Sequence, residues 1–529
     1  MKPPREFMRR HQGPVDVCIV GAGAAGSTLA KELAEGGLKV VVLEAGPWLD
    51  TQEDFLNDEL AMLGRLDWED PRVCDGGDPI PAGRPNTGKG VGGSTIHFTA
   101  MKLRLHPEDF KLKSTEGVGE DWPFTYEELA PYYERAEDFV GVSGPRDMPW
   151  PGNRESYPQG ELPMNAGDQV IAKGFEGLGM RWRMTPHAIL TGPKGDRSPC
   201  MYYGFCMNGC KSDAKGSALV TWVPAAVKAG AEFRERCYVT RIECDAQGRA
   251  RRVLYMHEGR EYAQEAELII VSGYSIESPR LLLNSACAPH PQGLANSSGL
   301  VGRYLQVHPA TIAYGHFPDP LDNFISPPVG IMTQDPYGTQ AGRDFIRGYM
   351  QNRYAYFPID FITTLIDDNP NLWGEELFRL MDTYTHWTIL TSMNEQLPDP
   401  NNRVGLAPEL KDDYGLPVAH VTMTFSDNDH RMLAHARDLN ERVLRAAGAD
   451  QVLHAKSAYH VLGTCRMGTD PGASVVDPFC RSHDIPNLFV CDGSVFVTQG
   501  AVNPSLTIEA IALRTAEHIL RAGPTPPPQ

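Results

Sequence analysis

Three glycines near the N-terminus have the spacing of a dinucleotide-binding turn. Gly21, Gly23 and Gly26 form the pattern G-x-G-x-x-G between an apolar run and a helix-compatible stretch. The first glycine permits a tight turn, the second lets the backbone approach a pyrophosphate, and the third lets the helix pack on the strand. Glu44 follows Gly26 by eighteen residues, where a carboxylate can bind ribose hydroxyls and disfavours a 2′-phosphate. These residues predict a site for FAD or NAD, because the motif alone does not separate the two.

A second group of residues with chemical potential is Cys200, Cys206 and Cys210, which are spaced C-x5-C-x3-C. Thiolates at close, irregular loop spacing suit an iron–sulfur cluster. Three cysteines fill a closed structural zinc site only when a histidine or a carboxylate joins them. Buried free thiols are the third interpretation. We expect the absence of a cluster over its presence, and the two alternatives to it stay open.

The elements that must position these residues alternate between strand and helix patterns. The runs VDVCIV (15–20) and LKVVVLEAG (38–46) flank the glycine turn and a helix-compatible stretch, which makes one βαβ unit. Residues 265–286 again read as strand, turn and helix, and the chain ends on the same pattern. Thr125, with Glu128 three residues later, predicts a capped amphipathic helix. We therefore expect an α/β fold.

Bulk composition restricts the number of domains and the partners. A chain of 529 residues is too long for one compact core and predicts two or three domains. The formal charge of −18 argues against nucleic acid or an anionic membrane as partner, and no apolar run approaches a membrane span. The leader MKPPREFMRRHQGPVD contains no separate apolar stretch, and eleven cysteines in a chain of this size predict reduced thiols. We expect a cytoplasmic location.

Four separated segments together resemble the glucose–methanol–choline (GMC) oxidoreductases, which are FAD-dependent enzymes. The first is GAGAAG with LEAG, and the second is GKGVGGSTIHFTAMKLR at 88–104. The third is GYSIESPRLLLNS, followed by GLANSSGLVGRYLQVHP. The fourth is YHVLGTCRMG, followed by NLFVCDGS and AVNPSLTIEAIALRTA. The order and spacing of the four make the resemblance specific over about residues 14–522, and it is closest to the bacterial gluconate and glucose dehydrogenase branch.

The resemblance implies a Rossmann-type FAD-binding domain assembled from discontinuous segments and a sheet-containing α+β substrate domain. The FAD-binding segments are expected at 14–115, 200–302 (which holds the cysteines) and 456–523. The substrate or cap region is expected at 116–199, the substrate-binding domain at 303–455, and a disordered tail at 524–529.

The same resemblance assigns the chemistry to His460 and Asn503, at the positions of the family's catalytic pair. Hydride leaves an alcohol carbon readily once the hydroxyl proton is removed, and a histidine suits that general-base role. The asparagine amide can donate a hydrogen bond to the substrate oxygen. The other histidines, including His308 and His483, are expected to be structural or solvent-facing.

Further flavin contacts follow from the matching loops. They are expected from Gly92, Gly93, Ser94, His97, Asp492 and Gly493, in addition to Gly21, Gly23, Gly26, Glu44 and Asn503. His97 stands where some relatives bond the flavin covalently through histidine and others hold it without a bond, so both arrangements stay open.

The resemblance also bears on the cysteines and on the electron acceptor. The segment 200–210 is similar to the stretch that holds a three-iron cluster in multisubunit sugar dehydrogenases. Those enzymes pass electrons to a haem subunit and carry a small partner, so the resemblance makes a small partner subunit possible here. Tyr203 stands where many of these relatives have a fourth cysteine, and the chain contains no C-x-x-C-H haem motif. Oxygen, a quinone and a protein all remain open as electron acceptor.

Sequence alone therefore predicts an FAD-dependent dehydrogenase or oxidase acting on the CH–OH group of a sugar, glycoside, polyol or other alcohol. A lyase with a structural flavin on the same scaffold, or the catalytic subunit of an electron-transferring complex, are the alternatives. A set of aromatic residues could stack on a substrate ring, although we favour core positions for them. The set is Tyr349, Tyr354, Tyr356, Phe357, Trp373, Tyr384 and Trp387.

Overall fold

The computed structural model describes residues 11, 13–66, 68, 70–80 and 87–523, so the tail expected at 524–529 lies outside the described residues. Within this part of the chain, no helix is both long enough and apolar enough to cross a bilayer. Cys200, Cys206 and Cys210 are free thiols.

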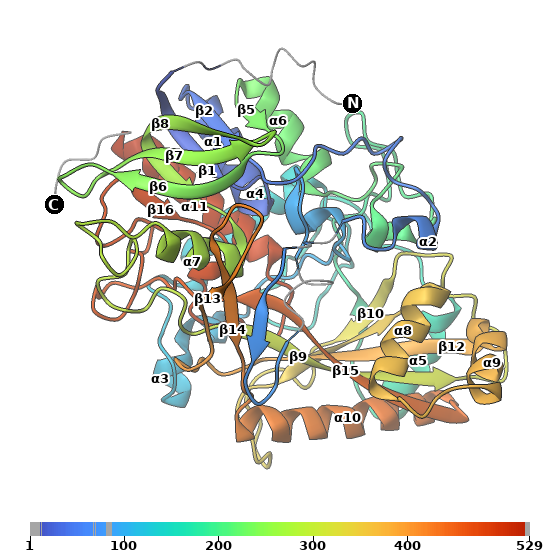
Figure 1. Ribbon diagram of the computed structural model, residues 1–529. Coiled ribbons are helices and arrows are strands. Elements are labelled where there is room, and N and C mark those ends of the chain that lie inside the picture. The colour runs from blue at the N-terminus through green and yellow to red at the C-terminus, as the bar shows by residue number, and fades with distance from the viewer. Residues whose placement is uncertain (1–10, 12, 67, 69, 81–86, 524–529) are drawn as a thin grey trace.

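The first sheet has seven strands in the order β5-β2-β1-β8-β7-β6, with β16 paired to β8 off this path (Figure 1). Its strands are β1 (Val15–Val20), β2 (Val40–Leu43), β5 (Glu232–Arg234), β6 (Tyr238–Cys244), β7 (Ala250–His257), β8 (Arg260–Val271) and β16 (Leu488–Val490). The pairs β5–β2, β2–β1, β1–β8 and β8–β16 are parallel. Strands β1 and β2 are almost wholly apolar because helices or loops cover both of their faces.

Strand β8 is long enough to serve two pairings. Its first half, residues 260–265, pairs antiparallel with β7, which continues into β6. Its second half, residues 266–271, pairs parallel with β1. The meander β6–β7–β8 is therefore an extension of the same sheet.

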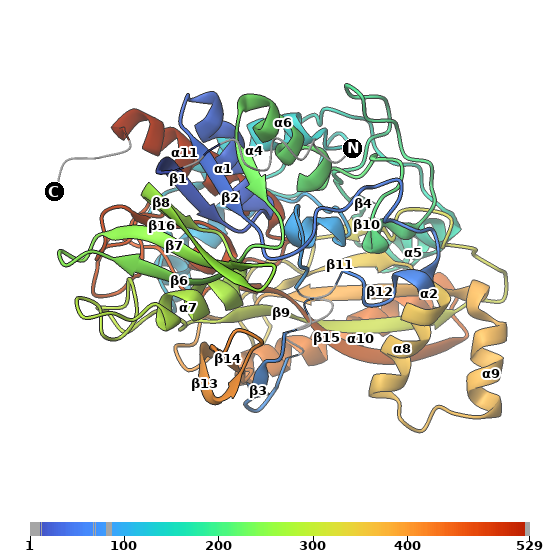
Figure 2. The same cartoon turned by 45° about the horizontal axis from the view of Figure 1, so that its top comes forward.

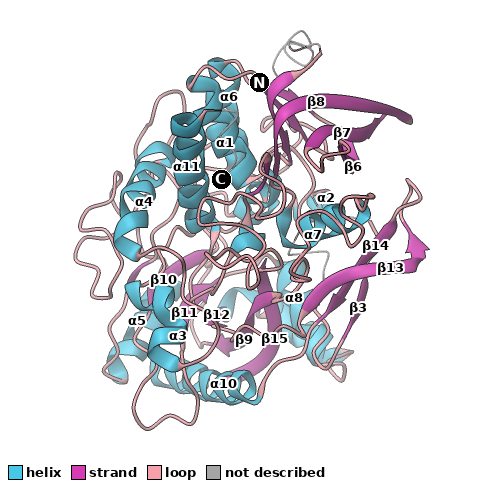
Figure 3. Ribbon diagram, turned by 90° about the vertical axis from the view of Figure 1, so that its left-hand side faces the viewer, coloured by secondary structure: helices cyan, strands magenta, loops and turns pink. Residues whose placement is uncertain are grey.

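Helices cover the parallel part of this sheet. The N-terminal helix α1 (Ala24–Glu35) packs against α6 (Trp222–Ala229) and α11 (Ser505–Ala522), and α11 also packs against α4 (Tyr126–Val140) (Figure 3). Helix α4 begins at the predicted Thr125 cap, with Thr125 and Glu128 forming a capping box.

The second sheet has the order β15-β9-β12-β11-β10-β4, and all its pairs are antiparallel. Its strands are β4 (Arg183–Met184), β9 (Gln306–His316), β10 (Val329–Thr333), β11 (Tyr349–Tyr354), β12 (Trp387–Asn394) and β15 (Gln451–Leu462). Helices α10 (Asp427–Ala447) and α5 (Ala166–Gly177) pack together, and α10 lies under β9 and β12 (Figures 1 and 3). Helix α8 (Pro358–Asp368) packs on β15.

A small third sheet and a few short helices complete the described elements. The third sheet joins β13 (Arg403–Lys411), β14 (Pro417–Thr422) and β3 (Val73–Asp75), and it lies beside α7 (Tyr274–Asn284), as Figure 2 shows. The remaining α-helices are α2 (Glu59–Met62), α3 (Leu112–Glu116) and α9 (Glu375–Asp382).

The predicted fold class is confirmed: a Rossmann-type α/β domain built from separated segments lies beside a second domain that contains its own sheet. The segment boundary expected between 455 and 456 falls inside β15, which runs from the edge of the second sheet toward the first domain.

Candidate active site

One large cavity, of about 1010 Å³, is lined by residues from both large sheets. Gly21, Glu44, Ser272 and Asp492 face it from the carboxyl ends of the parallel strands β1, β2, β8 and β16, or from the residues directly after them. Ligands of open α/β sheets bind at this edge, because the loops and helix N-termini that follow the strands meet there. The opposite wall is formed by residues of β11, α8 and β15, including His460.

The structure excludes a side chain at two of the three predicted glycines of the first turn, but not at the third. A Cβ on Gly21, which has φ +100°, would lie 2.3 Å from the Ser272 carbonyl oxygen, and one on Gly26 would lie 2.0 Å from the Gly21 carbonyl oxygen. Gly23 lines the cavity, and a Cβ there would meet only the Gly93 Cα, at 3.8 Å. The protein itself therefore requires Gly21 and Gly26, whereas Gly23 leaves space on the cavity side.

The predicted flavin loop lies directly on this turn. The amide of Gly92 donates to the Ala22 carbonyl at 2.9 Å, and a Cβ on Gly93, which has φ +56°, would lie 2.6 Å from the Gly23 Cα. The hydroxyl of Ser94 accepts a hydrogen bond from the Gly88 amide at 3.1 Å. Gly93 and Ser94 line the cavity, whereas Gly26 and Gly92 are not among its lining residues and shape the backbone beneath it.

Two buried carboxylates face the cavity from the first domain. Glu44 accepts the amides of Ala22 at 2.9 Å and Gly46 at 2.8 Å, one on each oxygen. The Gly90 backbone also donates to this carboxylate, so three of its four lone pairs are used and one remains for a ribose hydroxyl. Asp492 accepts the Tyr274 amide at 2.9 Å and the Ser278 hydroxyl at 2.6 Å, which joins the start of α7 to the end of β16. Burial raises the pKa of both carboxyl groups.

His97 follows the 3-10 helix at Gly93–Ile96 and lines the cavity. Its ring packs against backbone, since a Cβ on Gly88 would lie 2.5 Å from His97 Nε2. Gly493 also lines the cavity, and a Cβ there would lie 2.9 Å from Leu462 Cδ2.

The predicted pair, His460 and Asn503, meets at one wall of this cavity. His460 lies in β15 where the pairing with β9 shifts register between Tyr459 and Leu462, and its φ is +57°. Such a bulge re-aims a side chain, and histidine is among the residues that tolerate this backbone region. Asn503 comes from the loop directly before α11. Asn503 Nδ2 lies 3.1 Å from His460 Nε2.

The surroundings of this pair keep the imidazole neutral. Burial lowers the pKa of His460 well below its usual range, and the neighbouring His308 lowers it further. The oxygen of the Asn503 amide, Oδ1, is buried and has no hydrogen-bond partner within the described part of the chain. The site thus holds an unprotonated base beside an amide with an unused acceptor.

His308 is the member of the site that sequence reasoning missed, because it was expected to be structural. Its Nδ1 lies 3.2 Å from His460 Nδ1, and its Nε2 lies 2.7 Å from the Gly500 carbonyl oxygen. The pairing of Tyr459 with His308 brings β9 and β15 together across about 150 residues of sequence. Nothing in a single sequence indicates that register.

The three clustered cysteines lie behind the flavin loop. Cys206 is buried, whereas Cys200 and Cys210 are half-buried, and burial raises the pKa of Cys200 and Cys206. The buried ammonium group of Lys215 donates to the carbonyl of Ile96 at 2.5 Å and also to that of Cys206, so it ties the two segments together. Among the described residues, no group of three or more Cys, His, Asp and Glu side chains is arranged to hold a metal ion.

The aromatic residues considered for substrate stacking divide between the cavity, the core and the surface. Tyr354 and Tyr356 line the cavity, together with the neighbouring residues of β15. Tyr349 and Trp387 are core residues, and Trp373 is 76% exposed. Aromatic contact with a substrate is therefore available from the first pair.

Known proteins share this arrangement over nearly the whole chain. Sequence models of the GMC oxidoreductase family match residues 15–310 and 398–512. The chain is 31% identical to 2-methyl-1,2-propanediol dehydrogenase of Mycolicibacterium austroafricanum, covering 96% of this chain and 95% of that protein. It is also 31% identical to the fructose dehydrogenase large subunit of Gluconobacter japonicus, covering 96% and 97%. A formate oxidase variant of Aspergillus oryzae RIB40 shares the fold, with a TM-score of 0.69 at 16% identity over 96% of this chain and 98% of that one.

Proposed function

The chain belongs to the GMC oxidoreductase family, and from this membership we propose that it oxidises a CH–OH group of a sugar, glycoside, polyol or other alcohol with His460 as general base. The relatives named as dehydrogenases of a diol and of fructose support this substrate class. The observation that carries the proposal is the approach of His460 Nε2 and Asn503 Nδ2 to 3.1 Å on the cavity wall.

Each side chain of the pair has a separate task. A substrate hydroxyl that replaces their direct contact donates its hydrogen bond to His460 Nε2 and accepts one from Asn503 Nδ2. The neutral imidazole takes the hydroxyl proton, and the amide stabilises the negative charge that develops on the oxygen. The chemistry that bound FAD would supply is a hydride acceptor for the substrate carbon. Tyr354 and Tyr356 offer ring faces and hydroxyl groups to a polyhydroxylated substrate.

GMC oxidoreductases bind FAD, and the cavity fits that cofactor. Its volume of about 1010 Å³ lies at the upper end of the range of small-molecule sites, which suits a ligand as large as a dinucleotide. In this proposal the turn at Gly21 and Gly23 receives the pyrophosphate at the N-terminus of α1, and Glu44 receives the adenosine ribose. The remaining contacts come from Gly93, Ser94, His97, Asp492, Gly493 and Asn503, while Gly26 and Gly92 hold the backbone in place.

The proposal also covers His97, the three thiols and the partners of the protein. His97 contacts the flavin without a covalent bond, because its ring is packed against Gly88. The thiols of the 200–210 segment stay free. The expected segment boundaries and the cytoplasmic location remain predictions of the sequence. A partner subunit is supported by the relative named as a large subunit.

Anaerobic reduction of the flavin tests the proposal. Sugars, glycosides, polyols and aryl alcohols are screened for loss of flavin absorbance, and His460→Ala should slow the reduction by about 10²–10⁴-fold, the usual share of a general base. His483→Ala, a histidine outside the cavity lining, is the matched control and should react normally. Near-normal reduction of His460→Ala would remove His460 from the mechanism, and failure of every alcohol to bleach the flavin would favour a lyase.

The electron acceptor is tested on the same preparation. Peroxide formation in air identifies an oxidase, whereas reduction of an artificial dye without peroxide identifies a dehydrogenase. We expect dehydrogenase behaviour, because of the similarity of the 200–210 segment to that of sugar dehydrogenases.

A further inference from the structure

His308 lies behind the catalytic pair and does not itself line the described part of the cavity. It is fully buried on β9, opposite Tyr459 of β15. The bulge that follows Tyr459 turns His460 back toward this position, so that the two imidazole rings lie edge to face with centroids 5.2 Å apart. Among the residues that the structure describes, the His308 ring makes its polar contacts with His460 and with the Gly500 carbonyl.

The direction of the hydrogen bonds in this group is determined at one end. The Gly500 carbonyl oxygen can only accept, so His308 Nε2 must carry the proton of the 2.7 Å bond. Burial lowers the pKa of His308 to about 4, so at neutral pH its other nitrogen, Nδ1, is unprotonated and can only accept. The proton between the two rings therefore belongs to His460 Nδ1.

The consequence reaches the reacting nitrogen. A neutral imidazole carries one proton, so a proton on His460 Nδ1 leaves Nε2 with a free lone pair. The amide group that faces Nε2 at 3.1 Å must then be the NH2 of Asn503, which agrees with the orientation of that side chain.

We propose that His308 is a positioning residue that fixes His460 in its reactive tautomer, with the proton on Nδ1 and the lone pair on Nε2. The proposal concerns the same site as the proposed function and rests on it for the meaning of the tautomer. Because the partner of His460 is a neutral ring and not a carboxylate, it orients the base without supplying a negative charge to the imidazolium.

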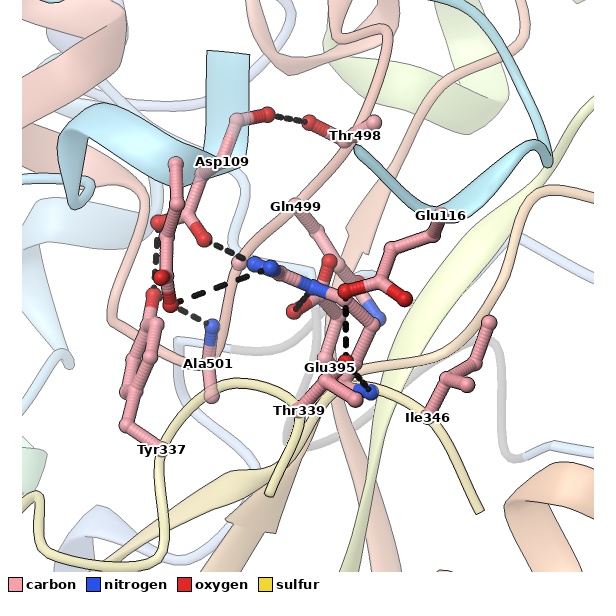
Figure 4. Close-up of polar contacts among 12 residues, drawn as sticks. Asp109, Glu116, Tyr337, Thr339, Ile346, Glu395, Thr498, Gln499 and Ala501 are labelled. Atoms are coloured by element: carbon pink, nitrogen blue, oxygen red, sulfur yellow. Dashed lines mark hydrogen bonds and ion pairs between the residues drawn. The ribbon is translucent and has the colours of Figure 1, made fainter. Parts of the chain in front are cut away.

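The acceptor at the end of this group is held by a buried network, which Figure 4 shows. The Thr498 hydroxyl donates to the Asp109 carbonyl at 2.7 Å, and the Ala501 amide donates to the Tyr337 hydroxyl at 2.9 Å. That hydroxyl in turn donates to Asp109 Oδ2 at 2.7 Å. Gly500 lies between these anchors, and a Cβ on it would be 2.7 Å from both Asp109 Oδ2 and the Tyr337 hydroxyl.

One charged group and one side-chain amide complete the support of the Gly500 loop, residues 498–501. The buried guanidinium of Arg347 binds Asp109 and also Glu395, at 2.8 Å in the second case. The side-chain amide of Gln499 donates to the Val307 carbonyl at 2.6 Å, directly beside His308. The carbonyl that orients His308 is thus fixed from both sides of the loop.

The tautomer can be measured on the FAD-loaded protein without a substrate. Protein labelled with 15N-histidine gives long-range 1H–15N spectra that distinguish an imidazole protonated on Nδ1 from one protonated on Nε2. His460→Asn and His308→Asn identify the two rings by loss of their signals. We expect the Nδ1–H form for His460 and the Nε2–H form for His308 at neutral pH.

Two substitutions separate orientation from packing. His308→Leu removes the acceptor, so His460 should lose its uniform Nδ1–H state, whereas His308→Asn keeps an oxygen near the Nδ1 position and should preserve it. His316→Leu, at the far end of β9, is the matched control. With an alcohol that reduces the flavin, His308→Leu should slow reduction by about 10²-fold and His308→Asn much less. FAD content and thermal unfolding show whether each variant is folded.

An Nε2–H signal for His460 in the unaltered protein would overturn the proposal, and this result needs no variant to fold. An unchanged Nδ1–H signal in His308→Leu would overturn it as well, as would equal slowing by the two substitutions. If the tautomers are as stated and no alcohol reduces the flavin, the proposed function fails while the assignment of His308 stands.

Discussion

Gly23 offers a test of where the cofactor lies, because its missing side chain is not required by the protein. A Cβ at this position would meet only the Gly93 Cα, at 3.8 Å, and the backbone has the ordinary φ of −78°. Gly23→Ala should therefore fold normally. If the pyrophosphate of FAD lies against this turn, however, the added methyl group occupies the space that the phosphate needs.

Gly23→Ala should change the free energy of unfolding much less than the free energy of FAD binding. For folding, replacing glycine by alanine gains about 0.4–1 kcal/mol through the unfolded chain and loses a similar amount at a helix N-cap, so the net change is near zero. For binding, displacement of the phosphate from one backbone amide costs about 1.5–3 kcal/mol. That loss corresponds to a weakening of the FAD affinity by roughly 10- to 150-fold.

The assay compares FAD occupancy, dissociation constant and thermal unfolding of the cofactor-free protein for three variants. Gly23→Ala should lose FAD and keep its unfolding temperature. Gly26→Ala should lose both, because its Cβ would lie 2.0 Å from the Gly21 carbonyl oxygen, and Gly160→Ala, with nothing within 4 Å, should lose neither. Normal FAD affinity of Gly23→Ala would refute the placement of the pyrophosphate, and destabilisation equal to that of Gly26→Ala would refute the packing argument.

Three other outcomes follow from the structure. Acid precipitation should leave a colourless pellet, because the His97 ring is packed against Gly88; a yellow pellet would mean a covalent flavin. Metal and sulfide analysis should find no stoichiometric iron, since burial raises the pKa of the Cys200 and Cys206 thiols and so disfavours the thiolates that iron requires; a three-iron content would reverse that assignment. Burial raises the pKa of Glu395 to about 8, so between pH 5 and 8 the native state keeps a proton that the unfolded chain has lost. The free energy of unfolding, measured by urea titration, should therefore fall by up to about 1.4 kcal/mol for each unit that the pH rises in this range. Glu395→Gln should flatten this slope.

Local patterns predicted the first domain well. The glycine turn, its flanking strands and the Thr125 cap depend on residues within a few positions of each other, and their geometry follows from backbone sterics and short hydrogen bonds. The signal for α10 was equally local, since Ser426 and Asp429 form a capping box in the structure, yet the sequence interpretation did not include that helix. The sequence thus contains the signal for the start of α10, although this helix was not predicted.

The site depended on contacts that no local pattern contains. His460 and Asn503 were reached through resemblance, and their approach requires β15 and the loop before α11 to meet over 43 residues of sequence. His308 required the register of β9 against β15, which is determined by side-chain packing across a whole sheet. The parallel pairing of β8 also required β1, from a distant part of the sequence, to lie beside its second half.

The cavity draws on both ends of the chain, and this has a consequence for biosynthesis. Its walls include Gly21 and Glu44, made early in translation, and Asp492, Asn503 and Ile508, made last. Domains generally form from the N-terminus as the chain is synthesised. A nascent chain that still lacks β16 and α11 therefore has only part of the proposed cofactor site, and the cavity can be completed only after α11 has left the ribosome.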